Sequence, residues 1–134
     1  MLERLLLVAV LAAAGLVIYR LYTRRHVQRV ASAPRDLLLH GLREGVPTIV
    51  YFTTPQCMPC KTQQMPALQT LQTELGERLQ VVRVDATEQP EAAERWGVFS
   101  VPTTFVLDRH GQAREVNYGV ADAAKLRRQL QAAG

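Results

Sequence analysis

The sequence has only two cysteines, Cys57 and Cys60, and its three histidines are scattered along the chain. A structural zinc site needs four ligands that the fold brings together. Because there is no third cysteine and the histidines fall in different predicted elements, we expect no metal site. The chemistry open to a cysteine pair also requires no organic cofactor.

The folded part of the chain has no excess of charge of either sign. The net charge of +4 comes from residues 1–36, which hold six arginines against two acidic residues, whereas residues 37–134 hold ten basic and ten acidic residues. A nucleic-acid-binding domain carries its basic excess on the folded surface, where it neutralises phosphates. We therefore expect no nucleic-acid partner.

One apolar run stands near the amino terminus. Residues 5–19 contain no charge, and the run extends to Tyr22 if the charged head of Arg20 reaches back toward the lipid interface. Eighteen helical residues cover about 27 Å, close to a bilayer core of about 30 Å. We expect residues 1–22 to be a single-pass transmembrane anchor in the cell membrane.

Two other interpretations of the apolar run are a cleaved signal peptide and a buried core helix. Ala31-Ser32-Ala33 resembles a cleavage site, but it lies well beyond the run and behind several arginines. A soluble domain has no evident use for such a helix before its first element. These observations favour a retained anchor.

The arginines around the span bear on its orientation. Arg4 precedes the apolar run, whereas Arg20, Arg24, Arg25 and Arg29 follow it. The positive-inside rule places the more basic flank in the cytoplasm. This bias favours a cytoplasmic domain. The alternative is an extracytoplasmic domain, because a marginal apolar segment near the amino terminus can also be exported as a signal anchor.

Residues 23–36 lack a sustained apolar period and are expected to form a juxtamembrane linker or a frayed helix end, followed by one folded domain over residues 37–134. The run from Val46 to Phe52 is typical of a strand buried on both faces. The expected elements are a short helix begun by Asp36 and ended by Gly45, a strand over 46–52, a helix over 61–75, a strand over 79–85, a helix over 88–96, strands over 103–108 and 112–118, and a helix over 122–130.

The chemistry concentrates at Cys57-Met58-Pro59-Cys60, between a predicted buried strand and the first turn of a predicted helix. Free backbone N–H groups and the helix dipole favour a thiolate over a thiol at this position. Cys57 is the expected nucleophile, and Cys60, one turn later, is expected to resolve the mixed disulfide. Pro59 suits the first turn and stiffens the loop, and Met58 and Pro59 are expected to support the site.

With this motif after a strand, Val101-Pro102-Thr103 before another strand and Gly119 after the last one, residues 37–134 resemble the thioredoxin superfamily. The resemblance implies an α/β fold with a central four-stranded mixed sheet flanked by helices. It also implies that Pro102 is cis and packs against the active-site disulfide. The backbone of Val101 would then bind an extended substrate as an added strand.

Several positions depart from the family pattern. Gln56 replaces the tryptophan that precedes the first cysteine, and Tyr51 and Arg83 stand where the family has a buried acid and its lysine partner. Pro66 comes one residue later than the usual helix-kinking proline, which indicates a bulge or a shifted kink. These departures favour a divergent, membrane-bound relative with narrower partners over a general thioredoxin.

The sequence thus predicts a membrane-tethered thiol–disulfide oxidoreductase that acts on protein disulfides. An unidentified reductant would return its cysteine pair to the dithiol form. Because no cationic histidine replaces Pro59 to stabilise the thiolate further, a protein-disulfide reductase is favoured over an oxidant. The alternative is a non-catalytic binding module in which the cysteines form a structural disulfide. The sequence leaves the oligomeric state open.

Overall fold

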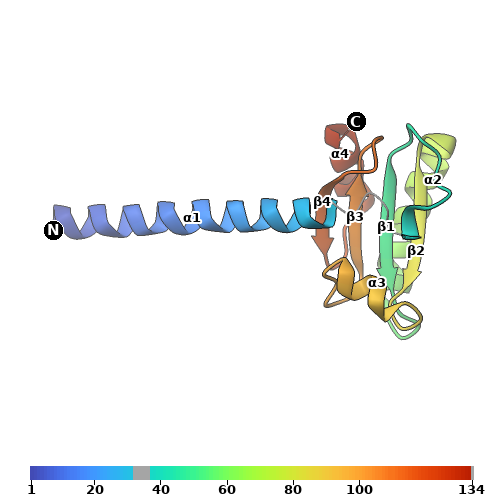
Figure 1. The fold of residues 1–134 in the computed structure, drawn as a ribbon, viewed down its shortest axis with the longest axis horizontal. Helices are drawn as coiled ribbons and strands as arrows, with labels where there is room; N and C mark the ends of the chain where they lie inside the picture. The colour runs from blue at the N-terminus through green and yellow to red at the C-terminus, as the bar shows by residue number, and fades with distance from the viewer. Residues whose placement is uncertain (32–36, 134) are drawn as a thin grey trace.

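The computed structural model describes residues 1–31 and 37–133 and begins with one long helix, α1 (Leu2–Ala31). The 24 residues Leu2–Arg25 are long and apolar enough to cross a membrane, and no part of their apolar stretch is buried against the domain. A signal sequence near the amino terminus meets the same criterion. Figure 1 shows α1 projecting from the domain, with its carboxyl-terminal end beside β4.

A four-stranded sheet forms the centre of the domain. Its strands are β1 (Thr48–Thr53), β2 (Gln80–Asp85), β3 (Thr103–Leu107) and β4 (Ala113–Tyr118), in the order β2-β1-β3-β4. β1 pairs with β2 in parallel and with β3 in antiparallel orientation, and β3 and β4 are antiparallel. The predicted mixed sheet is confirmed.

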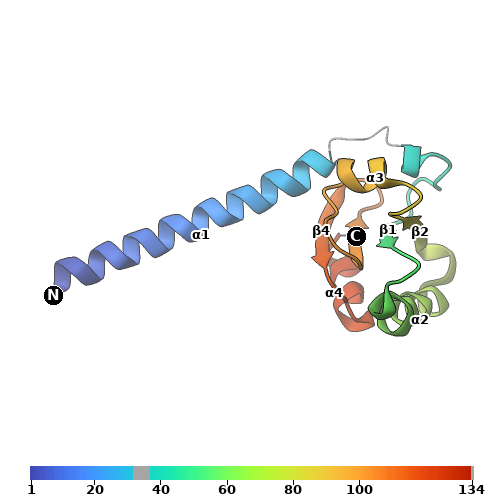
Figure 2. The same ribbon diagram turned by 90° about the horizontal axis from the view of Figure 1, so that it is seen from below.

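Helices cover both faces of this sheet. α2 (Met65–Leu75) and α4 (Ala123–Ala133) pack on one face, where Leu71 and Leu126 meet Ile49 of β1. α3 (Pro90–Arg95) packs on the other face. The two faces can be followed in Figures 1 and 2, where α3 lies apart from α2 and α4. Alternate residues of β1 therefore belong to different cores, as expected for a strand buried on both sides.

The lone tryptophan closes the α3 side of the core. Trp96, at the carboxyl end of α3, is 2% exposed. Its ring lies 4.9 Å from that of Phe105 and 5.9 Å from that of Phe52, in tilted and edge-on arrangements that aromatic pairs prefer. Trp96 is thus a core residue and takes no part in the cysteine site.

The first predicted helix of the domain was wrong in type and length. Leu37–Leu39 form only one 3₁₀ turn. The chain turns at Gly41 and Gly45, whose φ angles of 81° and 76° lie in the left-handed region that glycine adopts most easily. The predicted cap, Asp36, lies outside the described residues.

The helix after the cysteines begins irregularly. Residues Cys60–Gln64 form a π-helical turn in which the N–H of Met65 donates to the carbonyl oxygen of Cys60, five residues back. Pro66 stands in the first turn of α2, where its missing N–H costs little. Of the two alternatives that the position of Pro66 raised, the bulge is confirmed. The helix ends at Leu75 and a 3₁₀ turn, Gly76–Arg78, leads to β2.

Candidate active site

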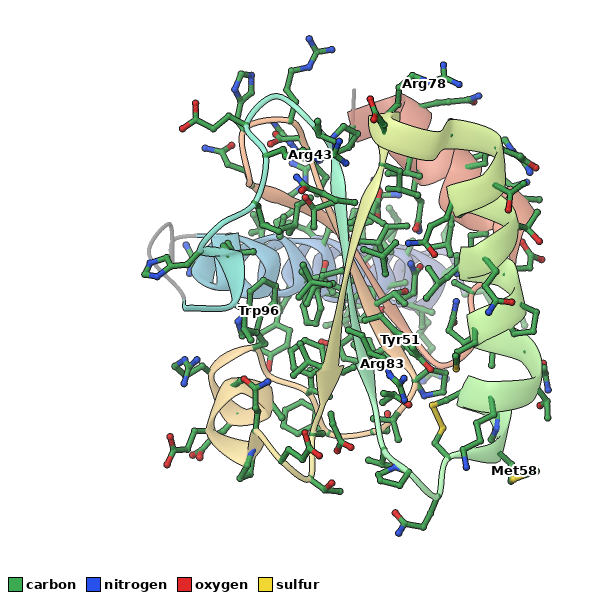
Figure 3. All side chains as sticks on the ribbon, turned by 90° about the vertical axis from the view of Figure 1, so that its right-hand side faces the viewer. Arg43, Tyr51, Met58, Arg78, Arg83 and Trp96 are labelled. Atoms are coloured by element: carbon green, nitrogen blue, oxygen red, sulfur yellow. A yellow bond between two sulfur atoms is a disulfide. The ribbon has the colours of Figure 1, made fainter. Side chains whose placement is uncertain are left out.

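Cys57 and Cys60 form a disulfide at the carboxyl end of β1, where the chain enters the helix that leads to α2. Cys57 is 8% exposed, whereas Cys60 is fully buried. Figure 3 shows the disulfide at the end of the domain, between the sheet and this helix. The structure therefore brings both predicted cysteines together and leaves Cys57 as the less buried residue of the two.

Backbone groups of the first helical turn face Cys57. The N–H of Cys60 donates a hydrogen bond of 3.2 Å to Sγ of Cys57, and the N–H of Lys61 donates to the Cys57 carbonyl at 3.3 Å. A donor aimed at a sulfur favours the charged thiolate after reduction, and the helix dipole acts in the same direction. Pro59 has helical backbone angles, and Met58 beside it is 62% exposed.

The peptide bond between Val101 and Pro102 is cis, as the family resemblance implied. Pro102 is buried, and its carbonyl oxygen accepts a hydrogen bond of 2.8 Å from the N–H of Gly119. The side chain of Val101 packs against the apolar cluster that contains both cysteines. Within the described part of the chain, no hydrogen bond uses the N–H or C=O of Val101, so both groups are open to an added strand.

This arrangement has close counterparts. The family model described as Thioredoxin matches residues 40–132. The chain belongs to the thioredoxin family. Family membership and the Cys57–Cys60 disulfide together support thiol–disulfide oxidoreductase activity in general.

Known thioredoxins cover the domain, and one relative covers the amino-terminal segment as well. The thioredoxin of Bacillus subtilis is 40% identical over 57% of this chain and 70% of its own. The thioredoxin-like protein YneN of the same organism is 24% identical over 94% of each chain. The solved thioredoxin of Fasciola hepatica has a TM-score of 0.58 and 25% identity over 68% of this chain and 84% of its own.

Tyr51, at the position where thioredoxins bury an acid, lies in the same apolar cluster as the disulfide. It is 1% exposed, and its hydroxyl has no hydrogen-bond partner among the described residues. Burial raises the pKa of Tyr51, and the smaller influences of the Thr53 hydroxyl and the Arg83 guanidinium act in the opposite direction. Arg83 lies opposite Tyr51 in the register of β1 and β2, so the two departures from the family pattern are neighbours.

Gln64 is a functional candidate that the sequence analysis missed. Its fully buried side chain donates to the carbonyl oxygen of Ala121 at 3.0 Å and accepts from the N–H of Ala121 at 2.9 Å. It thereby joins the π turn after the cysteines to the segment between β4 and α4. The contact spans 57 residues of sequence, so no local pattern could reveal it.

Phe99 was also missed. It is 87% exposed in the loop that leads to Val101, whereas most aromatic side chains of the domain are at least partly buried. The sequence did contain a feature that could have identified it: Phe99 is a large apolar residue two positions before Val101, and it belongs to no periodic apolar pattern that would place it in the core. Phe99 and Met58 are thus exposed apolar residues that stand close in sequence to the cis peptide bond and to the cysteines, respectively.

Proposed function

We propose that this chain is a membrane-tethered protein-disulfide reductase in which Cys57 is the nucleophile and Cys60 the resolving cysteine. The observation that carries the proposal is the hydrogen bond from the N–H of Cys60 to Sγ of Cys57. Cys57 is also the less buried residue of the pair, at 8% exposed against 0% for Cys60. The cysteine that has a donor at its sulfur and is the less buried of the two has the properties of the attacking thiolate.

The residues around Cys57 and Cys60 suit a substrate whose disulfide is part of a polypeptide chain. The open N–H and C=O of Val101 can pair with an extended segment, and the exposed Met58 and Phe99 can contact its side chains. A partner of this kind would present its disulfide to Cys57 while its backbone lies along Val101. Pro59 stiffens the loop between the two cysteines.

The reaction transfers two electrons to the partner. The Cys57 thiolate attacks one sulfur of the partner's disulfide, which forms a mixed disulfide and releases the partner's other sulfur as a thiolate. The Cys60 thiolate then attacks Sγ of Cys57, which closes the Cys57–Cys60 disulfide and releases the second partner thiolate. Solvent protonates the released thiolates, and an external dithiol returns the pair to its reduced form.

Substitution of each cysteine tests these roles. We expect Cys57→Ser to abolish dithiothreitol-driven insulin reduction by the full chain in detergent. Cys60→Ser should instead accumulate a mixed disulfide with the partner, visible by non-reducing electrophoresis and released by dithiothreitol. Both variants lack the crosslink, so a loss of stability alone would affect them alike. Insulin reduction retained by Cys57→Ser would exclude the proposed nucleophile and favour a binding module.

The reduction potential tests the direction of electron flow. No cationic histidine stands at Pro59 to stabilise the thiolate further, which supports a reductase. We expect the pair to equilibrate with dithiothreitol near the thioredoxin value of about −270 mV. A potential near −120 mV would identify an oxidant, and a pair that stays oxidised throughout the titration would indicate a structural disulfide.

The proposed tether consists of residues 1–22 as the anchor and residues 23–36 as the juxtamembrane segment of the domain, residues 37–134. The length and apolar composition of Leu2–Arg25 support the anchor. The arginines that follow the span support a cytoplasmic position for the domain.

A further inference from the structure

Tyr51 holds a hydroxyl group that lacks a hydrogen bond in the oxidised protein. The residue is 1% exposed, and its Oη has no partner among the described residues. A buried hydroxyl without a partner is costly because folding removes its hydrogen bonds to water. Such groups are rare in folded proteins, and each one calls for a reason.

The position of Tyr51 limits what could accept its proton. Strand alternation places Ile49, Tyr51 and Thr53 on the same face of β1, and Tyr51 shares its apolar cluster with both cysteines. Figure 3 shows Tyr51 and Arg83 on the side of the sheet that faces the α2 helix, where the disulfide also lies. The disulfide sulfurs therefore belong to the same apolar cluster as the phenol.

The other polar groups near Tyr51 do not meet this need. Arg83, its register partner on β2, carries only donors and cannot accept the phenolic proton. Thr104, its register partner on β3, accepts a hydrogen bond of 3.2 Å from Asn117, and no hydrogen bond joins it to the Tyr51 hydroxyl. The hydroxyl of Thr53 donates to the carbonyl oxygen of Thr54 at 3.4 Å, and its influence lowers the pKa of Tyr51, which is the effect of a donor and not of an acceptor for the phenolic proton. In the oxidised protein, the Tyr51 hydroxyl therefore has no acceptor for its proton among the described residues.

Reduction changes the acceptors available. A disulfide sulfur is a weak acceptor, whereas a thiolate carries a full charge and accepts strong hydrogen bonds. Cys60 is fully buried, so water does not solvate its sulfur after reduction. After reduction, a buried sulfur that can accept a hydrogen bond and a buried hydroxyl without a partner lie in one cluster.

We propose that the Tyr51 hydroxyl donates a hydrogen bond to Sγ of Cys60 when the Cys57–Cys60 disulfide is reduced, and so stabilises the reduced pair. Tyr51 keeps its proton throughout and acts as a positioning residue for the resolving sulfur. Burial supports this role, because it raises the pKa of Tyr51 and keeps the phenol a donor. The inference rests on the proposed dithiol cycle.

The test is the equilibrium between the full chain and dithiothreitol in detergent at pH 7, measured by thiol labelling for the wild type, Tyr51→Phe and Tyr118→Phe. Loss of a hydrogen bond made only in the reduced state should lower the equilibrium constant for reduction about tenfold in Tyr51→Phe, a potential roughly 30 mV more negative. Tyr118, 52% exposed on β4, is the matched control and should leave the constant unchanged.

A second readout separates this role from a purely structural one. The oxidised Tyr51→Phe protein should unfold in urea at the same concentration as the wild type or a higher one, because the variant removes an unpartnered polar atom. The inference would be overturned if Tyr51→Phe lowered the stability of the oxidised and the reduced protein equally and left the reduction potential unchanged. An unshifted potential with intact insulin reduction contradicts the hydrogen bond alone, whereas a pair that dithiothreitol never reduces contradicts the proposed function as well.

Discussion

At the scale of single residues, Asp108 organises the turn between β3 and β4. Its carboxylate accepts hydrogen bonds from the N–H of His110 at 2.8 Å, the N–H of Gln112 at 3.0 Å and the guanidinium of Arg114 at 2.8 Å. Burial alone would raise the pKa of Asp108, but these bonds and the Arg114 charge outweigh it and hold the pKa below its usual value. The ionised form is therefore favoured by folding.

We predict that Asp108→Ala lowers the free energy of unfolding by about 1–3 kcal/mol at pH 7, because three partly buried hydrogen bonds to the carboxylate are lost. A depressed folded-state pKa contributes stability above the unfolded value of about 3.9, and this contribution is lost as the pH falls through the folded value. The difference between wild type and variant should therefore shrink between pH 5 and about pH 2. Urea unfolding across this range measures it, with the exposed Glu115→Gln as control, and an equal difference at all pH values would contradict the assignment.

The sequence analysis succeeded with residues whose role depends on local context. The cysteine pair follows from a short motif at an element boundary, and the family resemblance carried by Val101-Pro102-Thr103 implied the cis bond before Pro102. The unpartnered hydroxyl of Tyr51 could not be predicted, because it depends on what three separate strands and a helix bring around one side chain.

At the scale of elements, Gln64 fastens the helix after the cysteines to the segment before α4. We predict that Gln64→Ala destabilises the domain by about 2–4 kcal/mol, because the buried N–H and C=O of Ala121 both lose their partner. Thermal unfolding measures the loss. Gln63→Ala is the matched control, since Gln63 is exposed on the same turn. Equal effects of the two substitutions would show that the contact adds little.

The strands and α2 could be predicted because their apolar patterns are long and regular. The first helix of the domain could not, since three leucines in a row favour a helix while two glycines in left-handed conformations end it after one turn. The extra residue before Pro66 predicted a bulge or a shifted kink, but the pattern alone did not show that a π turn would point Gln64 into the core.

At the scale of the whole molecule, α1 is expected to decide where the protein resides. We predict that the double variant Leu11→Arg and Ala14→Arg moves the chain from the membrane fraction to the soluble fraction, because each arginine at the centre of a span costs about 2.5–3.5 kcal/mol. Gln131→Arg with Ala132→Arg is the control, since it adds the same charge to exposed positions of α4. Wild-type protein found in the soluble fraction without α1 would instead identify a cleaved signal sequence.

The side of the membrane can be measured separately. The arginines that follow the span predict a cytoplasmic domain. A maleimide reagent that cannot cross membranes should therefore label the reduced Cys57 only after cells are opened. Labelling of intact cells would place the domain outside and overturn the orientation, without bearing on the anchor itself.

The proposed anchoring of the chain by α1 has a consequence for how far the domain lies from the lipid. Beyond the 24 residues that match a span, the helix runs on only to Ala31, which adds about 9 Å at ~1.5 Å per residue. In the tethered arrangement so short a stalk confines the disulfide to a thin layer above the lipid. Encounters then become a search in two dimensions, which raises the effective concentration of disulfides in the same membrane and disfavours those in bulk solution. Substrates would then be selected first by how close their disulfides lie to the membrane surface, and only afterwards by contacts with side chains.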